Sequence, residues 1–493
     1  MQTTEPTNIS NVLDTLIVGA GISGLSLAHA MQAEQESNQK PWQILLAEKQ
    51  GRVGGRIVTS SGDGFIWEEG PNSFSPTPAL LKLAVDVGLE HELVLADRRL
   101  PRYIYWQGEL MPVPMNPQAA IATRLLSFPG KLRAVIGALG FVPPAMGNDE
   151  ETVFEFFQRH LGIEVTQRLV EPFVSGIYAG DPHQLSAAAA FPRIVRLADI
   201  GGGLLAGAVL SRRMSVKPTA PPDPKLPKTR PGELGSFREG IEALPRAIAS
   251  RLGERVKLNW HLLSLRLTEG QTYLAEFSTP SGNVCIESRS VVLTTPAYVT
   301  ADLLQPLHPQ IASALRGISY PPVACVVLAY PVEAFKIPLR GFGNLIPRGQ
   351  GIRTLGTIWA SSLFSGRAPH GWNLLINFIG GATFPAIASL DKKQIAAAVH
   401  QDLCHTLLKK NVEPKVLAVH LWQRAIPQYT KGHHQRLEQI NQGLQQLPGL
   451  YLCGNYTDGV ALGDCVRRAF DCATNVRQFL QKQKINNSNS NKK

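Results

Sequence analysis

Residues 15–24, TLIVGAGISG, decide the fold. The apolar run 15–18 predicts a buried strand, and the pattern from Ser23 to about Ala33 predicts a helix. A GxGxxG motif between a strand and a helix is typical of a dinucleotide-binding βαβ unit, because its glycines allow a tight turn, a close pyrophosphate and close helix packing. The helix N-terminus adds N–H donors and partial positive charge. We therefore expect cofactor contacts from Gly19, Ala20, Gly21, Ile22, Ser23 and Gly24.

A second strand is expected at residues 43–47, after a polar loop at 32–41. Glu48 ends this strand, where a carboxylate can accept hydrogen bonds from a ribose diol. Residues 51–56, GRVGGR, follow at once, and Arg56 can neutralise phosphate with its forked donors. A second glycine motif so close to Glu48 favours FAD over NAD. The alternatives are a surface glutamate and a basic turn without a ligand.

The C-terminal end repeats the pattern of a short strand followed by a glycine-rich turn. Residues 450–455, LYLCGN, predict the strand, and 459–464, GVALGD, open a final helix that we expect to end near Lys482. A helix N-terminus aimed at a flavin ring can stabilise negative charge on it. Asp464 is either an N-cap or a flavin contact.

The overall composition is that of a large globular protein with a basic surface. The chain has 493 residues, of which 44% are hydrophobic, and a formal net charge of +11. Its longest apolar runs are roughly ten residues, whereas a membrane-spanning helix needs about 18 or more. The charge fits an anionic partner, such as a membrane surface, nucleic acid or a polyanionic substrate, or it serves solubility alone.

The middle of the chain differs from its ends. Residues 76–235 carry helical stretches broken by Pro and Gly, and 211–232 contain six prolines and six Lys or Arg, which predicts an exposed basic loop. Residues 125–141 and 193–210 mix apolar and basic side chains. They are either helices on a bilayer surface or core helices of a second domain. Strands are expected from about 256 to 381, and a helix at 391–409.

Neither cysteines nor histidines suggest a metal site or a nucleophile. The six cysteines are scattered without CxxC spacing, which fits a reducing compartment. The pair His433–His434 lies in a polar stretch and is expected to be solvated. Residues 1–14 have no signal-peptide or transit-peptide character, so we expect a cytoplasmic protein.

Taken together, the motifs resemble a known family. GAGISG, EKQGRVGGR, GPNSF at 70–74, VVLTTP at 291–296 and the C-terminal GNYTDGVALGDCVRRA are similar to the flavin amine oxidase superfamily. Within it the chain resembles the oxygen-dependent protoporphyrinogen IX oxidases of plant and cyanobacterial type. Residues 172–182, 341–347 and 354–362 agree with that family, and the resemblance covers about 14 to 480.

The resemblance implies an α/β protein, α+β overall, in which a Rossmann-like FAD-binding domain adjoins a mixed-sheet substrate domain and a helical membrane-associated domain. The FAD-binding domain would comprise 14–75, 236–296 and 421–482. A mainly helical membrane-binding and substrate part would span 76–235, the substrate domain 297–420 and a disordered tail 483–493. FAD would be bound non-covalently. The further cofactor positions are Glu48, Lys49, Arg56, Gly70, Pro71, Asn72, Ser73, Val256, Trp422, Gly454, Val460, Ala461 and Leu462.

The resemblance also implies a substrate site for protoporphyrinogen IX. Arg102 would anchor a propionate, since Arg binds carboxylate bidentately. Leu345, Ile358 and Phe378 would sandwich pyrrole rings, and Gly176 would lie near the reacting bridge carbon. The implied reaction is hydride transfer from that bridge to the flavin, repeated until three O2 become three H2O2. Taken alone, Arg102 is an exposed loop residue and the apolar three are ordinary core.

Other functions remain open at this stage. Coproporphyrinogen III oxidation differs only in the substrate's extra propionates, and a carotenoid desaturase or an amine oxidase would share the superfamily. A membrane-bound scaffold would bind FAD without turnover. A nucleic-acid partner is disfavoured, because the basic residues lack aromatic interleaving. Peripheral membrane association is expected, and a homodimer is possible within the resemblance.

Overall fold

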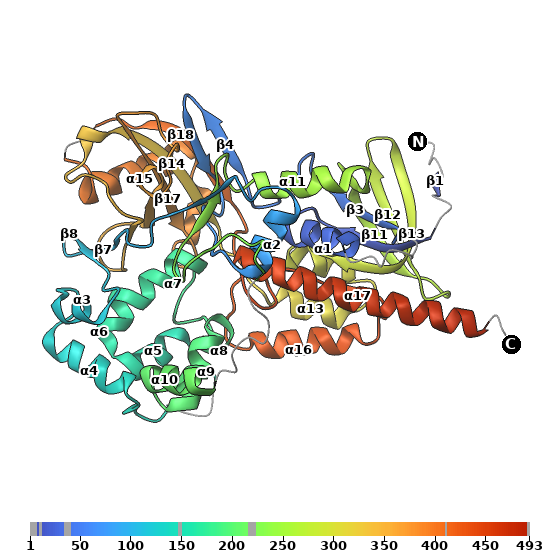
Figure 1. Cartoon of the computed structure of the whole chain (residues 1–493), viewed down its shortest axis with the longest axis horizontal. Coiled ribbons are helices and arrows are strands. Elements are labelled where there is room, and N and C mark those ends of the chain that lie inside the picture. The colour runs from blue at the N-terminus through green and yellow to red at the C-terminus, as the bar shows by residue number, and fades with distance from the viewer. Residues whose placement is uncertain are drawn as a thin grey trace.

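The computed structural model describes residues 7–8, 12–33, 41–145, 150–214, 223–409 and 412–490. Figure 1 shows three regions. One sheet and its helices lie at the end of the molecule where both termini are marked, a second sheet lies at the other end, and a group of helices lies below the second sheet. Part of the loop expected at 32–41 and part of the basic loop expected at 211–232 lie outside the described residues.

The first sheet has eight strands and contains the βαβ unit. Its central strands are parallel, and β13 continues into an antiparallel extension. The strands expected at 15–18 and 43–47 and the helix expected from Ser23 are confirmed. The strands are, in spatial order, β10 (Val256–Leu258), β3 (Ile44–Glu48), β2 (Leu13–Val18), β13 (Gly282–Leu293), β12 (Tyr273–Thr279) and β11 (His261–Leu267), with β1 (Thr7–Asn8) and β19 (Leu450–Leu452) also paired to β13.

Helices cover both faces of this sheet, which explains the continuous apolar run in β2. Ile17 packs into the core on one face, whereas Leu16 and Val18 pack into the core on the other. The first face is covered by α1 (Ile22–Ala33), α2 (Pro78–Asp86), α11 (Ala243–Leu252) and α17 (Leu462–Ser490). The second face is covered by α12 (Ala297–Leu304), α13 (Pro309–Arg316) and α16 (His433–Leu444).

The second sheet has seven strands, one face of which packs against α15 (Lys392–Thr406). The other face packs against the hairpin of β4 (Thr59–Gly62) and β5 (Phe65–Glu68), which contributes Phe65 and Trp67. The strand order is β18 (Lys415–Trp422), β14 (Val323–Pro331), β17 (Trp372–Gly380), β16 (Thr354–Trp359), β15 (Gly343–Leu345), β7 (Arg102–Trp106) and β8 (Glu109–Pro112).

The third region is helical and lies at one end of the molecule (Figure 1). It begins with α3 (Pro117–Ala122) and α4 (Phe128–Ala138). It continues with α5 (Val153–Leu161), α6 (Ile163–Val165), η1 (Thr166–Val170), α7 (Glu171–Tyr178), α8 (Ala187–Ala190), α9 (Pro192–Gly201) and α10 (Leu204–Met214). A capping box of Thr152 and Glu155 fixes the start of α5.

Short elements join these regions: β6 (Leu93–Leu95) pairs with β9 (Gly235–Phe237), and α14 (Ala360–Leu363) follows β16. The remaining short helices are η2 (Gly253–Arg255), η3 (Val332–Ala334) and η4 (Pro385–Ser389).

Helices make up most of the region 76–235, which also contributes β7 and β8 to the second sheet through pairing with distant β15. Two expectations differ from the structure. Residues 211–214, expected in a loop, end helix α10. The tail expected to be disordered from 483 continues α17 through Ser490. Extending a formed helix adds one hydrogen bond per residue without a new nucleation cost, which explains both differences.

Candidate functional site: a nucleotide cradle beside an apolar sheet face

The turn between β2 and α1 has the shape that a pyrophosphate requires. Gly19 has φ +106°, which favours glycine, and a Cβ on Gly24 would collide with the Gly19 carbonyl oxygen. A Cβ on Gly21 would instead meet nothing within 4 Å. Gly24 therefore lets α1 pack closely on the strand, while Gly21 borders open space at the helix N-terminus.

Glu48 is held at the end of β3 by two backbone donors. Its carboxylate accepts from Ala20 N at 2.7 Å and from Gln50 N at 2.9 Å. The edge strand β10 runs alongside, with Val256 paired to Leu46. Lys49 is exposed beside Glu48. These residues stand together at the carboxyl end of the parallel strands, where α/β sheets bind nucleotides.

The second glycine motif packs directly on the first. Gly54 N donates to Ala20 O at 2.8 Å, and Gly21 and Gly54 form a parallel bridge. Arg56 stacks over the Trp422 ring at 4.5 Å, and its Nη2 donates to Arg424 O at 2.5 Å. Burial lowers the pKa of Arg56. Two predicted cofactor residues from opposite ends of the chain are thus in contact.

The segment 70–74 and the N-terminus of α17 close the cradle. Residue 70 must be glycine, because a Cβ there would collide with the Arg56 carbonyl oxygen. Asn72 Oδ1 accepts from Ser73 Oγ at 3.2 Å. Leu462 begins α17 and packs with Ile22 of α1 in the same core. Helices α1 and α17 pack against each other, and Ile22 and Leu462 near their N-termini belong to one core cluster. The remaining positions, Pro71, Gly454, Val460 and Ala461, stay predictions.

These features fit FAD by their own geometry. The space at Gly21, two neighbouring helix N-termini and the carboxylate of Glu48 supply phosphate and ribose partners. Asp464 lies in the first turn of α17, not at its N-cap. Burial raises the pKa of Asp464.

The predicted substrate residues lie on one face of the second sheet. Ile104, Leu345, Gly356 and Phe378 are paired across four strands in one row. Arg102, Gly343, Ile358 and Ile376 form the parallel row two residues away. Because residues two apart share a face, Arg102, Leu345, Ile358 and Phe378 point to the same side.

Gly176 in α7 lies across from the Leu345 side chain. A Cβ on Gly176 would lie 2.6 Å from Leu345 Cδ2, so a larger residue at 176 would displace the Leu345 side chain. Arg102 lies 5.5 Å from the Phe342 ring, and no carboxylate pairs with it in the part of the chain that the structure describes. The arrangement is an apolar surface with one available guanidinium at its end.

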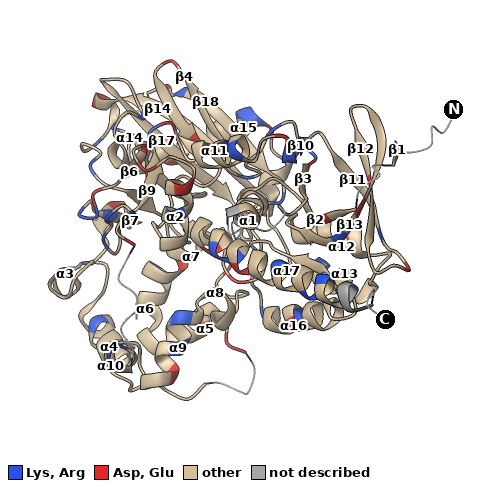
Figure 2. Ribbon diagram, turned by 45° about the vertical axis from the view of Figure 1, so that its right-hand side comes forward, with Lys and Arg blue, Asp and Glu red and all other residues tan. Residues whose placement is uncertain are grey.

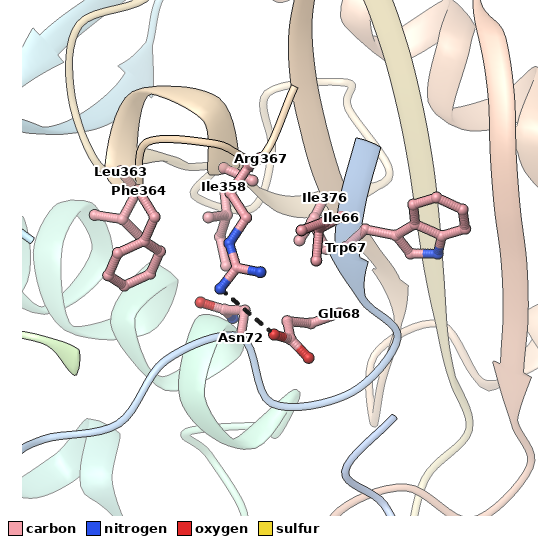
Figure 3. A pocket seen from close by; sticks show the side chains of 10 residues that line it. Ile66, Trp67, Glu68, Asn72, Ile358, Leu363, Phe364, Arg367 and Ile376 are labelled. Carbon is pink, nitrogen blue, oxygen red and sulfur yellow. Dashed lines mark ion pairs between the residues drawn. The ribbon is translucent and has the colours of Figure 1, made fainter. Parts of the chain in front are cut away.

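On the same side of the sheet, next to Ile358, lies a buried ion pair that the motifs did not reveal. Arg367 and Glu68 are 3.9 Å apart and at most 4% exposed. Figure 3 shows the Arg367 guanidinium directed toward Glu68 and Asn72. They line a cavity of about 10 Å³ with Ile358, which is room for one water. Burial raises the pKa of Glu68 to about 7. Its oxygens accept from Thr59 Oγ1 at 2.6 Å and Ile241 N at 2.9 Å.

The expectation for His433 is wrong. His433 is 1% exposed and stacks on Tyr429 at 4.3 Å, and burial lowers its pKa to about 4. His433 lies on the inner face of α16, although its neighbours in sequence are polar. Neither Tyr429 nor Arg367 belongs to a motif, and no sequence signal marked them.

Known proteins resemble this chain over nearly its whole length. A model of the family "Flavin containing amine oxidoreductase" matches residues 22–477. The chain is 45% identical over 480 residues to a chloroplastic protoporphyrinogen oxidase of Nicotiana tabacum, covering 95% of this chain and 86% of that one. It is 31% identical over 486 residues to a coproporphyrinogen III oxidase of Bacillus subtilis, covering 94% and 98%.

A solved structure shares the fold. A candidate protoporphyrinogen oxidase from Exiguobacterium sp. superposes with a TM-score of 0.78 at 26% identity, covering 96% of this chain and 99% of that chain.

Proposed function

This chain belongs to the flavin-containing amine oxidoreductase family and, within it, to the protoporphyrinogen oxidases, and we propose that it oxidises protoporphyrinogen IX to protoporphyrin IX with bound FAD. The reaction removes six electrons and six protons from the tetrapyrrole, and three O2 become three H2O2. The enzyme would act in tetrapyrrole biosynthesis.

One observation carries this proposal: an available arginine and an apolar sheet face lie together opposite Gly176. Protoporphyrinogen is apolar except for its propionates, so it matches a surface with Leu345, Ile358 and Phe378 and a guanidinium at the end. Arg102 would hold a propionate bidentately. The apolar residues would exclude water and orient the macrocycle.

FAD would be held non-covalently by the cradle residues. Gly19, Gly21 and Gly24 would receive the pyrophosphate, Glu48 the ribose, and Asn72, Ser73 and residues 460–462 the ring. The cysteines nearest the C-terminal turn do not favour attachment, because burial raises the pKa of Cys465 to about 12, and a hydrogen bond with Cys472 together with burial raises the pKa of Cys453. Bound FAD supplies the two-electron acceptor of each round, and O2 reoxidises it.

Coproporphyrinogen III is the second candidate substrate, because a 31% identical relative bears that name. The identity of 45% to the chloroplastic protoporphyrinogen oxidase favours protoporphyrinogen.

Peripheral membrane association is proposed for the helical region. No single helix in the described ranges is long and apolar enough to cross a bilayer, although α9 and residues 204–213, bent by 86°, together reach the length. Helix α3 buries no residue and α4 buries only Gly137. Their exposed apolar side chains include Ile121, Phe128, Leu132 and Val135. A homodimer stays a prediction, for which light scattering is the measurement.

The test mixes the purified flavoprotein with protoporphyrinogen IX first without and then with O2, and with coproporphyrinogen III in parallel. We expect flavin bleaching, then porphyrin fluorescence and peroxide on admitting O2. The variant Arg102→Ala should raise KM roughly tenfold to a hundredfold, because a charged hydrogen-bonded pair is lost. Arg99→Ala is the matched control, since Arg99 is exposed and pairs with Asp97. A flavin that both porphyrinogens leave oxidised would contradict the proposal.

A further inference from the structure

Two consecutive buried residues, Gln428 and Tyr429, connect the two walls of the proposed site. They are 3% and 1% exposed and lie in the segment between β18 and α16. The backbone of this segment is fixed on both sides. Gln428 N donates to Ser319 O at 2.9 Å, and Ser186 N donates to Tyr429 O at 2.8 Å. The pair is therefore anchored independently of its side chains.

The Gln428 side chain holds the turn that follows α7. Its Nε2 donates to Tyr178 O at 2.9 Å, and a Cβ on Gly180 would lie 2.6 Å from its Oε1. The turn needs this support, because Ala179 has a left-handed φ of 47°. Since α7 carries Gly176 against Leu345, the amide of Gln428 sets the position of the wall that would face the substrate.

The Tyr429 side chain holds the opposite wall. Its hydroxyl donates to Asn455 O at 2.5 Å and accepts from Gly459 N at 3.0 Å. Asn455 and Gly459 lie at the two ends of the turn that leads to residues 460–462 at the start of α17. The imidazole of His433 stacks on the Tyr429 ring, and the planes of the two rings are inclined by 16°.

We propose that Gln428 and Tyr429 are positioning residues, Gln428 for the substrate-facing turn at 176–180 and Tyr429 for the flavin-facing turn at 455–459. This inference rests on the proposed function. Because the two residues are adjacent on one anchored segment, they fix the separation between the two walls. A hydroxyl that bridges two arms of a turn restricts it more than either hydrogen bond alone.

The test separates the two roles with isosteric variants. Tyr429→Phe removes only the bridging hydroxyl, and we expect the FAD dissociation constant to rise about tenfold with KM for protoporphyrinogen IX unchanged. Gln428→Met removes only the amide, and we expect KM to rise about tenfold with FAD affinity unchanged. Tyr273→Phe is the matched control, because that buried hydroxyl donates to Pro448 O at 3.1 Å, outside the proposed flavin contacts.

FAD affinity is measured by fluorescence titration of the apoprotein, and folding by thermal unfolding. The inference is overturned if Tyr429→Phe binds FAD as the wild type does, or if both variants shift both constants alike. Should Gln428→Met not fold, Gln428→Leu, whose side chain has no hydrogen-bond donor, takes its place. Absence of porphyrinogen turnover in the wild type would refute the proposed function, whereas the FAD titration would still decide the role of Tyr429.

Discussion

Adjacent carboxyl groups at the end of β5 experience opposite environments. Burial raises the pKa of Glu68 to about 7. A hydrogen bond from His420 lowers the pKa of Glu69, whose Oε2 lies 2.9 Å from His420 Nδ1. The two side chains follow each other in sequence, yet only Glu68 enters the buried cluster with Arg367 (Figure 3).

Stability should respond to pH with opposite sign at these two residues. A carboxyl whose folded pKa is raised contributes stability below its unfolded pKa, 4.5, and loses it as pH rises through about 7. The free energy of unfolding of the wild type should therefore fall by roughly 3 kcal/mol between pH 5 and 8 through Glu68, and Glu68→Gln should not show this fall. Urea unfolding of both proteins across that range measures it.

Glu69→Gln is the control with the reverse sign. The lowered pKa of Glu69 gives stability that is present above its usual pKa and lost as pH falls. A wild-type stability curve parallel to that of Glu68→Gln from pH 5 to 8 would contradict the assignment of Glu68.

Local residues of the site were predictable, and those held by distant partners were not. The pattern at 15–24 contains strand, turn and helix within one short stretch, so α1 followed from it. Arg367 and Tyr429 have no motif, because their partners, Glu68 and Gly459, are brought near only by folding. His433 was misjudged because its polar neighbours are exposed while its own side chain points inward.

At the scale of elements, the packing of α1 on the first sheet depends on Gly24, whereas ligand access depends on Gly21. A Cβ on Gly24 would collide with Gly19 O, so Gly24→Ala should destabilise the fold by about 2 kcal/mol. Gly21→Ala meets only open space, so thermal stability of the apoprotein should be unchanged. FAD affinity should fall for Gly21→Ala, because the new methyl group would occupy the pyrophosphate position.

Thermal unfolding of the apoproteins and FAD titration distinguish the two variants. If Gly21→Ala and the wild type bound FAD with equal affinity, the pyrophosphate would not bind at this turn. Gly270→Ala is the matched control, because Gly270 lies on the exposed turn between β11 and β12 and an added Cβ would make only an ordinary contact.

Strand register shows where prediction from sequence ends. Each strand of the second sheet has an apolar pattern, but the row Ile104–Leu345–Gly356–Phe378 arises only from pairing among β7, β15, β16 and β17. A pattern of period two indicates a strand's faces and not its neighbour. The sequence therefore predicted a mainly helical region at 76–235, but not that β7 and β8 within it complete the second sheet.

At the scale of the whole molecule, charge and apolar surface are unevenly distributed. Figure 2 shows the end formed by α3, α4 and α10 mostly in the colour of uncharged residues, with Lys and Arg on α4. Phe128 and Phe141 are 79% and 73% exposed there. A cluster of large exposed apolar side chains beside basic ones is typical of a surface that contacts anionic lipid.

Membrane binding should therefore depend on this end of the molecule. The double variant Phe128→Glu/Phe141→Glu should lower binding to vesicles of phosphatidylglycerol and phosphatidylcholine at least about tenfold, because two aromatic side chains no longer enter the lipid and two charges oppose the anionic surface. Leu263→Glu/Val416→Glu is the matched control, since Leu263 and Val416 are 46% and 50% exposed on the sheets. Sedimentation with vesicles measures the bound fraction, and solution turnover shows that the fold is intact. Equal losses in both double variants would mean that charge alone governs the attraction and that α3 and α4 do not enter the lipid.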